Sequence, residues 1–150
     1  MTEIKIERAQ PADIPTIAKL ASILYREEDE NLLMQEFTAF QTSQHDALFI
    51  AKHAREIIGF VHLALRFEYV EGADTSPVGY VEGIYIVPAF RQQKVARQLL
   101  EQGGAWAKQK GCTQLASDAE LENTVSQAFH EQVGFEEVNR GVSYIKTLAK

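Results

Sequence analysis

The sequence has 150 residues, of which 45% are hydrophobic and 24% charged, with a formal net charge of -6. This length predicts one domain with a core of its own, and the acidic balance argues against a nucleic-acid partner, which would need a basic face. No apolar run approaches the roughly 20 residues of a membrane span, and no signal peptide is expected. Cys112 is the one cysteine, so an internal disulfide is excluded and a cytoplasmic protein is predicted.

The first half of the chain predicts two helices between strands. Residues 4–9 alternate like a strand, and Asp13 is expected to cap a helix with apolar positions from 14 to 24. An acidic run at 26–31 precedes a second helix around 32–40. Two antiparallel strands, 47–54 and 57–70, are expected to join at Arg55 and Glu56, with Gly59 a candidate for a β-bulge.

The second half predicts a parallel crossover. The composition of residues 71–77 is typical of a loop. In GYVEGIYIVPAFRQQKVARQLLEQ (79–102), a strand ends at Pro88, which has no amide hydrogen for a ladder, and a helical period begins at Val95. The amides at such a helix start form an anion site that suits phosphate.

The last third predicts one further strand, a helix and a closing strand. Residues 112–119 should lie parallel to the strand at 79–87 if the helix between them is a crossover. Residues 123–133 predict a helix that Gly134 closes, and residues 137–148 a final strand. The expected fold class is therefore α/β (α+β).

Two ordered motifs carry a resemblance to a known family. The first is the unit of strand, Pro88, RQQKVA and helix, and the second is Asn-x2-Ser-x3-His-x3-Gly-Phe from 123 to 135. Together they resemble the GNAT superfamily of acyl-CoA-dependent N-acetyltransferases. The segments at 65–91, 106–113 and 116–137 are similar, more narrowly, to the aminoglycoside 6'-N-acetyltransferases of resistant bacteria.

The resemblance implies a single GNAT domain over residues 1–150. Its sheet would be central, mixed and mostly antiparallel, with a splayed parallel pair, and about four helices would flank it. The resemblance also implies acetyl-CoA as cosubstrate, an aminoglycoside as the small-molecule partner, a homodimer, and a role in antibiotic resistance. No membrane or nucleic-acid partner is expected.

The resemblance also implies a set of residues that bind acetyl-CoA. Main-chain groups of Ile84, Tyr85 and Ile86 would bond the pantetheine arm like an added strand. Asn123 would bond the same arm, or it could serve only as a helix cap. The pyrophosphate would lie on the loop and first helical turn formed by Arg91, Gln92, Gln93, Lys94, Val95, Ala96 and Arg97. Lys94 stands where the family has glycine, so its side chain could obstruct the cosubstrate or add a cation beside it.

Glu82 is the expected general base. Acetylation needs a neutral amine, and a carboxylate can take the ammonium proton directly or through water while its charge holds the cation. A bulge near Gly83 would aim Glu82 into the active site. The alternative is a structural glutamate that pairs with a neighbouring arginine.

Asp118 and His130 are the other candidate catalytic residues. Asp118 would be a second carboxylate beside Glu82, or an ordinary turn aspartate. His130 stands where many superfamily members have a tyrosine that protonates the departing CoA thiolate, although a packed or surface histidine is equally common.

Further residues would contact the substrate besides Glu82 and Asp118. Tyr25 stands where some relatives have tryptophan and would supply an aromatic wall. Tyr69 matches a substrate-contacting tyrosine that can reach a neighbouring subunit's site, or it simply packs. Asn139 replaces a glutamate of close relatives, which removes one anionic contact to an amino sugar.

The expected reaction is direct acetyl transfer in a ternary complex to the 6'-amine of an aminoglycoside. One alternative is a GNAT enzyme for another amine, such as a polyamine or a peptide N-terminus. A second is a non-catalytic acyl-CoA-binding module. The histidines His45, His53 and His62 show no ligand spacing, so no metal site is expected, and the motif of a P-loop kinase is absent from the sequence.

Overall fold

The computed structural model describes residues 3–149, which divide after Ser117 into two compact units. The first unit holds a five-stranded sheet in the order β1-β2-β3-β4-β5. Its strands are β1 (Ile4–Arg8), β2 (Asp46–His53), β3 (Glu56–Arg66), β4 (Val78–Ile86) and β5 (Leu115–Ala116). Neighbours from β1 to β4 are antiparallel and β4 pairs with β5 in parallel, which confirms the predicted mixed, mostly antiparallel sheet.

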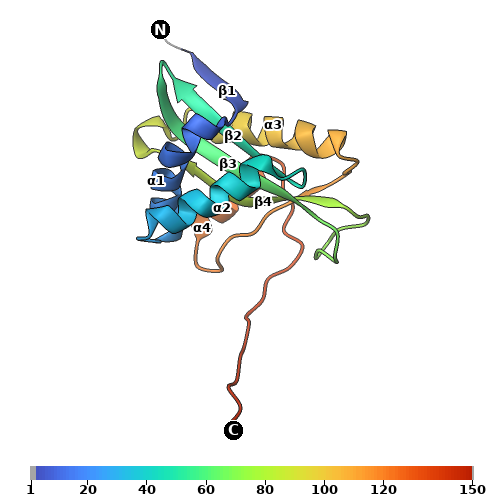
Figure 1. Ribbon diagram of the computed structural model, residues 1–150. Coiled ribbons are helices and arrows are strands. Elements are labelled where there is room, and N and C mark those ends of the chain that lie inside the picture. Colours follow the sequence, from blue (N-terminus) through green and yellow to red (C-terminus); the bar gives the residue numbers. More distant parts are fainter. Residues whose placement is uncertain (1–2, 150) are drawn as a thin grey trace. The chain divides into compact units, whose positions relative to one another are not determined.

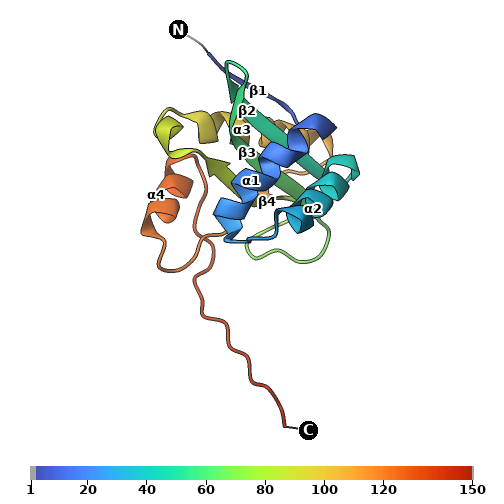
Figure 2. The same ribbon diagram turned by 60° about the vertical axis from the view of Figure 1, so that its left-hand side comes forward.

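Helices cover both faces of this sheet. On one face lie α1 (Ile14–Tyr25) and α2 (Glu30–Thr42), and on the other lies α3 (Val95–Gln109), as Figures 1 and 2 show. Short 3-10 turns, Pro11–Asp13 and Pro88–Phe90, precede α1 and follow β4. The second unit contains α4 (Thr124–Gln132). Among the described residues, no helix is long and apolar enough to cross a membrane.

The core between the sheet and the α1–α2 pair is mainly aliphatic, with an aromatic cluster beneath α2. Phe37 of α2 is 1% exposed and meets Phe60 of β3 edge to face, with ring centroids 5.7 Å apart. His62 is also buried here, with its ring stacked on Phe40 at 4.1 Å and Nε2 2.7 Å from Asp46 Oδ1. The carboxylate satisfies the histidine nitrogen, which would otherwise cost free energy in this apolar environment.

Two expectations about helix starts need correction. The Asp13 carboxylate accepts from the Gln10 amide at 2.8 Å, so it fixes the preceding 3-10 turn and bonds no amide of α1. The second helix begins at Glu30, earlier than predicted, because Asp29 Oδ1 accepts from the Leu32 amide at 3.0 Å and caps it. The acidic run therefore supplies a helix cap.

Three expected strands are shorter than predicted or absent. β3 ends at Arg66, where the Phe67 carbonyl accepts from the Ser76 hydroxyl at 2.9 Å. β5 spans only Leu115–Ala116. The final strand at 137–148 was wrong for this chain: these described residues form no ladder, and Ile145 is 97% exposed. Strand-forming residue types do not by themselves provide a neighbouring edge to pair with.

The end of α4 follows the prediction. Gly134 has a φ of 98°, the left-handed region that favours glycine at the C′ position. The Phe135 amide donates to the His130 carbonyl at 2.9 Å, and the Gly134 amide donates to Glu131 at 3.2 Å. This pair of bonds is the Schellman motif.

Two adjacent glycines of α3 predict opposite effects of alanine. A Cβ at Gly103 would lie 2.5 Å from Cδ2 of the fully buried Leu63, whereas nothing lies within 4 Å of a Cβ at Gly104. We expect Gly103→Ala to lower the free energy of unfolding by about 1–3 kcal/mol through overpacking. Gly104→Ala should raise it by about 0.5–1 kcal/mol through helix propensity. Urea denaturation of both variants measures this, and equal effects would contradict the packing of α3 on β3.

Candidate active site

Glu82 is the extra residue of a β-bulge in β4. In the register with β3, His62 lies opposite Gly83 and Leu63 lies opposite Val81, which leaves Glu82 with no residue across from it. The bulge expected near Gly83 is therefore confirmed. The Glu82 side chain is one-quarter exposed, although the strand around it is largely buried.

Tyr25, the last residue of α1, braces this bulge. Its hydroxyl donates to the Glu82 carbonyl at 3.3 Å. The phenol reaches this position only because Gly83 has no side chain, since a Cβ there would overlap the Tyr25 oxygen. Tyr25 is 43% exposed, so its ring can still contact a ligand while its hydroxyl fixes the backbone of β4.

The Glu82 carboxylate is paired with Arg66 at the end of β3. Arg66 Nε donates to Oε2 at 3.0 Å and Nη2 donates to Oε1 at 2.9 Å, the two-point geometry of a guanidinium on a carboxylate. The guanidinium carbon also lies 3.4 Å from the centroid of the Tyr80 ring. The alternative left open by the sequence, a glutamate paired to an arginine, is thus present. An ionised carboxylate has about four lone-pair sites, so two bonds to Arg66 leave acceptor capacity on both oxygens.

The open edge of β4 begins one residue before Glu82. Within the first unit, β5 pairs with β4 only at Gly79 and Tyr80. The strand continues to Ile86 without β5 beside it, and residues 82–85 are all half-buried. An unpaired strand edge can accept an extended ligand through its main-chain groups. Ile84, Tyr85 and Ile86, the predicted pantetheine-binding residues, form the far end of this edge.

Arg91 connects the following loop back to β4. Its Nε donates to the Ile86 carbonyl at 2.8 Å, and its guanidinium lies over the Tyr85 ring at 5.3 Å. Gln93 makes a similar local bond, from Nε2 to the Ala89 carbonyl at 3.3 Å. These side chains hold the loop in place, which leaves the main chain to face a ligand.

The loop backbone forms an anion-binding shape at the start of α3. Gln92 and Lys94 both have left-handed φ values, 64° and 65°, and Lys94 is the N-cap of α3. Alternation of left-handed and ordinary backbone conformations turns successive amides toward one side. The first amides of a helix also have no partners within it. The arrangement fits a diphosphate. It also explains why glycine suits position 94, since a side chain is strained in this region.

The second unit holds four of the other predicted residues, Asp118, Asn123, His130 and Asn139. The Asn123 side chain accepts from the Ser126 amide at 3.0 Å and caps α4, the alternative that the sequence left open. His130 Nδ1 donates to the Ser126 carbonyl at 2.7 Å, and its ring packs 5.3 Å from that of Phe135. Asp118 and Asn139 are exposed.

Tyr69 lies in the loop between β3 and β4. It is 80% exposed, and its hydroxyl donates to Glu71 Oε2 at 3.1 Å. This hydrogen bond to a carboxylate raises the pKa of Tyr69. Tyr69 therefore does not simply pack, and its hydroxyl remains a donor at neutral pH.

Arg66 and Tyr80 were missed as site residues. Arg66 belongs to the segment at 65–91 that carried the narrower resemblance, but nothing in the sequence paired it with Glu82. The first unit contains Tyr25, Glu82 and the residues from Ile84 to Arg97. They lie in α1, in β4, in the loop after β4 and in the first turn of α3. The roles of these residues stay predictions.

Cys112 is a poor candidate for a nucleophile. It is 5% exposed, and burial raises the pKa of its thiol. A nucleophilic cysteine needs an accessible thiolate, and this environment favours the neutral thiol.

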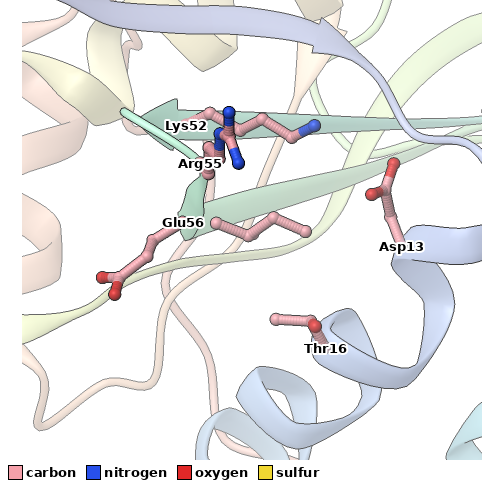
Figure 3. A pocket seen from close by; sticks show the side chains of 6 residues that line it. Asp13, Thr16, Lys52, Arg55 and Glu56 are labelled. Atoms are coloured by element: carbon pink, nitrogen blue, oxygen red, sulfur yellow. The ribbon is translucent and has the colours of Figure 1, made fainter.

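A separate hollow lies at the start of α1, beside the β2–β3 turn (Figure 3). Its lining residues are Asp13, Thr16, Lys52, Arg55, Glu56 and Ile57. Two acidic and two basic side chains balance each other, and Lys52 also pairs with Glu7 at 3.2 Å. None of the predicted site residues lines it, so it is distinct from the open edge of β4.

Comparisons with known proteins identify the family of the chain. The family model described as "Acetyltransferase (GNAT) family" matches residues 14–135. An aminoglycoside N(6')-acetyltransferase type 1 from Acinetobacter haemolyticus is 36% identical over 97% of this chain and 99% of its own. One from Salmonella typhimurium is 45% identical over 69% of this chain and 72% of its own. The structure of AAC(6')-Iy with the bisubstrate analogue CoA-S-monomethyl-acetylneamine is 34% identical, covers 98% of this chain and 100% of its own, and has a TM-score of 0.92.

Proposed function

Because this chain belongs to the acetyltransferase (GNAT) family, we propose that it transfers the acetyl group of acetyl-CoA to the 6'-amino group of aminoglycosides. The observation that carries the proposal is the Glu82 carboxylate, presented by a bulge at the start of an open strand edge. The named activity of relatives that match most of the chain supports the substrate class.

The reaction needs three things from the chain: cation binding, proton removal and support for an oxyanion. Acetyl-CoA supplies an acetyl group activated as a thioester. We assign cation binding and proton removal, through a water, to Glu82, whose free lone pairs can accept from an ammonium. The deprotonated amine attacks in a ternary complex, a main-chain amide of β4 donates to the developing oxyanion, and CoA leaves as the thiol.

The binding of acetyl-CoA would use the open edge and the anion-binding loop together. Ile84, Tyr85 and Ile86 offer main-chain groups to the extended arm, and the amides from Gln92 to Arg97 suit the diphosphate. Arg91 and Gln93 would act indirectly by fixing the loop. Asn123 would combine its observed cap of α4 with a contact to the arm.

The remaining roles are assigned to exposed or partly exposed side chains. Asp118 would contribute a second anion for a polycationic substrate, and Asn139 a neutral contact. Tyr25 and Tyr69 would contact the sugar rings. His130 would protonate the leaving thiolate. Because the family match runs from residue 14 to 135 and so crosses the boundary after Ser117, we propose that both units form one catalytic domain.

Replacement of Glu82 tests the function. With acetyl-CoA and kanamycin or tobramycin, we expect thiol release from the unchanged protein and a fall in kcat of about 100-fold or more in Glu82→Gln, because general-base catalysis is lost. Glu7→Gln is the matched control, since Glu7 is also ion-paired but lies on β1, at the opposite edge of the sheet.

Each other outcome identifies an alternative. Turnover that survives in Glu82→Gln removes Glu82 as the base and leaves the enzyme. Absence of thiol release with every aminoglycoside, although acetyl-CoA binds in calorimetry, would overturn the substrate proposal in favour of another amine or a non-catalytic acyl-CoA-binding module.

The loop predicts different effects of glycine at two strained positions. Lys94→Gly and Gln92→Gly should each raise the free energy of unfolding by about 0.5–1 kcal/mol, because both residues have left-handed φ values. Only Lys94→Gly removes a cation beside the diphosphate, so we expect its KM for acetyl-CoA to rise roughly threefold to tenfold. A lower KM in Lys94→Gly would show that the lysine obstructs the cosubstrate.

A homodimer is also proposed. The segment after α4 exposes a series of apolar side chains, and large exposed apolar surface marks interaction sites. Its members are Val138, Val142, Tyr144, Ile145 and Leu148. A second copy of the chain would cover them.

Light scattering after size-exclusion chromatography tests the dimer. We expect twice the mass of one chain for the unchanged protein and the mass of one chain for the double variant Tyr144→Lys, Ile145→Glu. Val125→Lys is the control, because Val125 is 81% exposed but lies in α4. A single-chain mass for the unchanged protein would contradict the proposal.

A cytoplasmic location and a role in resistance complete the proposal. The lone cysteine forms no internal disulfide, which suits a reducing compartment. An acetylated 6'-amine loses its positive charge, and this would weaken aminoglycoside binding to a polyanionic target.

A further inference from the structure

Arg66 is held in a position where it can direct the Glu82 carboxylate. Its register partner in β4 is Val78, so its side chain runs diagonally along the sheet to reach Glu82. On the way it crosses Tyr80, which lies opposite the small residue Ala64. The guanidinium therefore stacks at 3.4 Å on the Tyr80 ring and still donates two hydrogen bonds.

Glu82 is fixed at two separate points. Tyr25 bonds its carbonyl, and Arg66 bonds both oxygens of its carboxylate. Two-point bonding fixes the plane of the carboxylate as well as its position, which a single contact from a lysine cannot do. A bulge residue lacks a partner opposite it in the ladder, so its side chain depends on such contacts for orientation.

We propose that Arg66 is a positioning residue for acetyl transfer, which turns the free lone pairs of the Glu82 carboxylate toward the substrate amine. This inference rests on the proposed role of Glu82. The pair is partly exposed, with side chains 43% and 25% accessible, so its effect on stability is small and its effect on geometry matters more. Reactions of this kind lose about 100-fold in rate when a reacting group is displaced by about 1 Å.

Arg66 also affects how strongly the site attracts cations. Its positive charge compensates Glu82, so a carboxylate without it would bind an ammonium more tightly. Loss of Arg66 should therefore separate the two kinetic constants. The kcat falls because the carboxylate is misdirected, whereas KM for the aminoglycoside stays the same or decreases.

Arg66→Met tests this in the full chain with acetyl-CoA and tobramycin. We expect kcat to fall roughly 10- to 100-fold, with KM for tobramycin unchanged or lower and KM for acetyl-CoA within about twofold. Arg66→Lys, which keeps the charge but bonds at one point, should lie between Arg66→Met and the unchanged protein. Arg8→Met is the matched control. The Arg8 guanidinium also lies over an aromatic ring, that of Phe49, but Arg8 belongs to β1 and lies far from Glu82 in the sheet order.

The double variant Arg66→Met, Glu82→Gln shows whether Arg66 acts through Glu82. We expect kcat of the double variant to be within about twofold of Glu82→Gln alone. Losses that multiply would overturn the proposal, as would a raised KM with an unchanged kcat. If Arg66→Met fails to fold, Arg66→Lys carries the same test, because an intact rate there also overturns the proposal.

The proposed role of Glu82 and that of Arg66 can fail separately. Full turnover in Glu82→Gln removes the role of Glu82, and the positioning role goes with it. A large loss in Glu82→Gln beside normal kcat in Arg66→Met would retain the proposed function and reject only the role of Arg66.

Discussion

The extra residue of β4 is the constraint on which the candidate site depends. Between the pairs His62–Gly83 and Leu63–Val81, β4 has one residue more than β3, so Glu82 lies outside the ladder. The residues around Glu82 are arranged to suit this position. Gly83 must lack a side chain so that Tyr25 can reach the Glu82 carbonyl, and Tyr25 is placed by α1, whose buried face packs on the sheet. Core packing therefore determines where a partly exposed carboxylate lies.

The loop before α3 shows a second use of unfavourable local geometry. Gln92 and Lys94 have left-handed backbone conformations that would suit glycine. The side chains of Arg91 and Gln93 hold the loop by donating to the carbonyls of Ile86 and Ala89. These left-handed conformations cost free energy, and they turn the amides of the loop outward. The Glu82 carboxylate therefore lies at one end of the open edge of β4, and the loop that carries Arg91 and Lys94 lies at the other end.

Much of this architecture could be predicted because its signals are local. Pro88 ends a strand wherever it occurs, the helical period after it is visible in a short window, and Gly134 marks a helix end. The bulge near Gly83 was predicted together with the role that the family resemblance implies for Glu82, and the register of β3 and β4 confirms it. The pairing of Arg66 with Glu82 was not, since it depends on the register of two strands. The expected strand at 137–148 failed for a related reason: its residue types suit a ladder, but its partner cannot be read from sequence.

The burial of Cys112 determines how the folded chain responds to thiol reagents. Cys112 carries the one thiol in the sequence, and it is buried just after the end of α3. Its environment raises the thiol pKa and so favours the neutral form. A thiol-reactive dye therefore reads free CoA in the folded protein with little contribution from the polypeptide. The same dye becomes a reporter of global opening when CoA is absent, because labelling then requires the core beneath α3 to come apart.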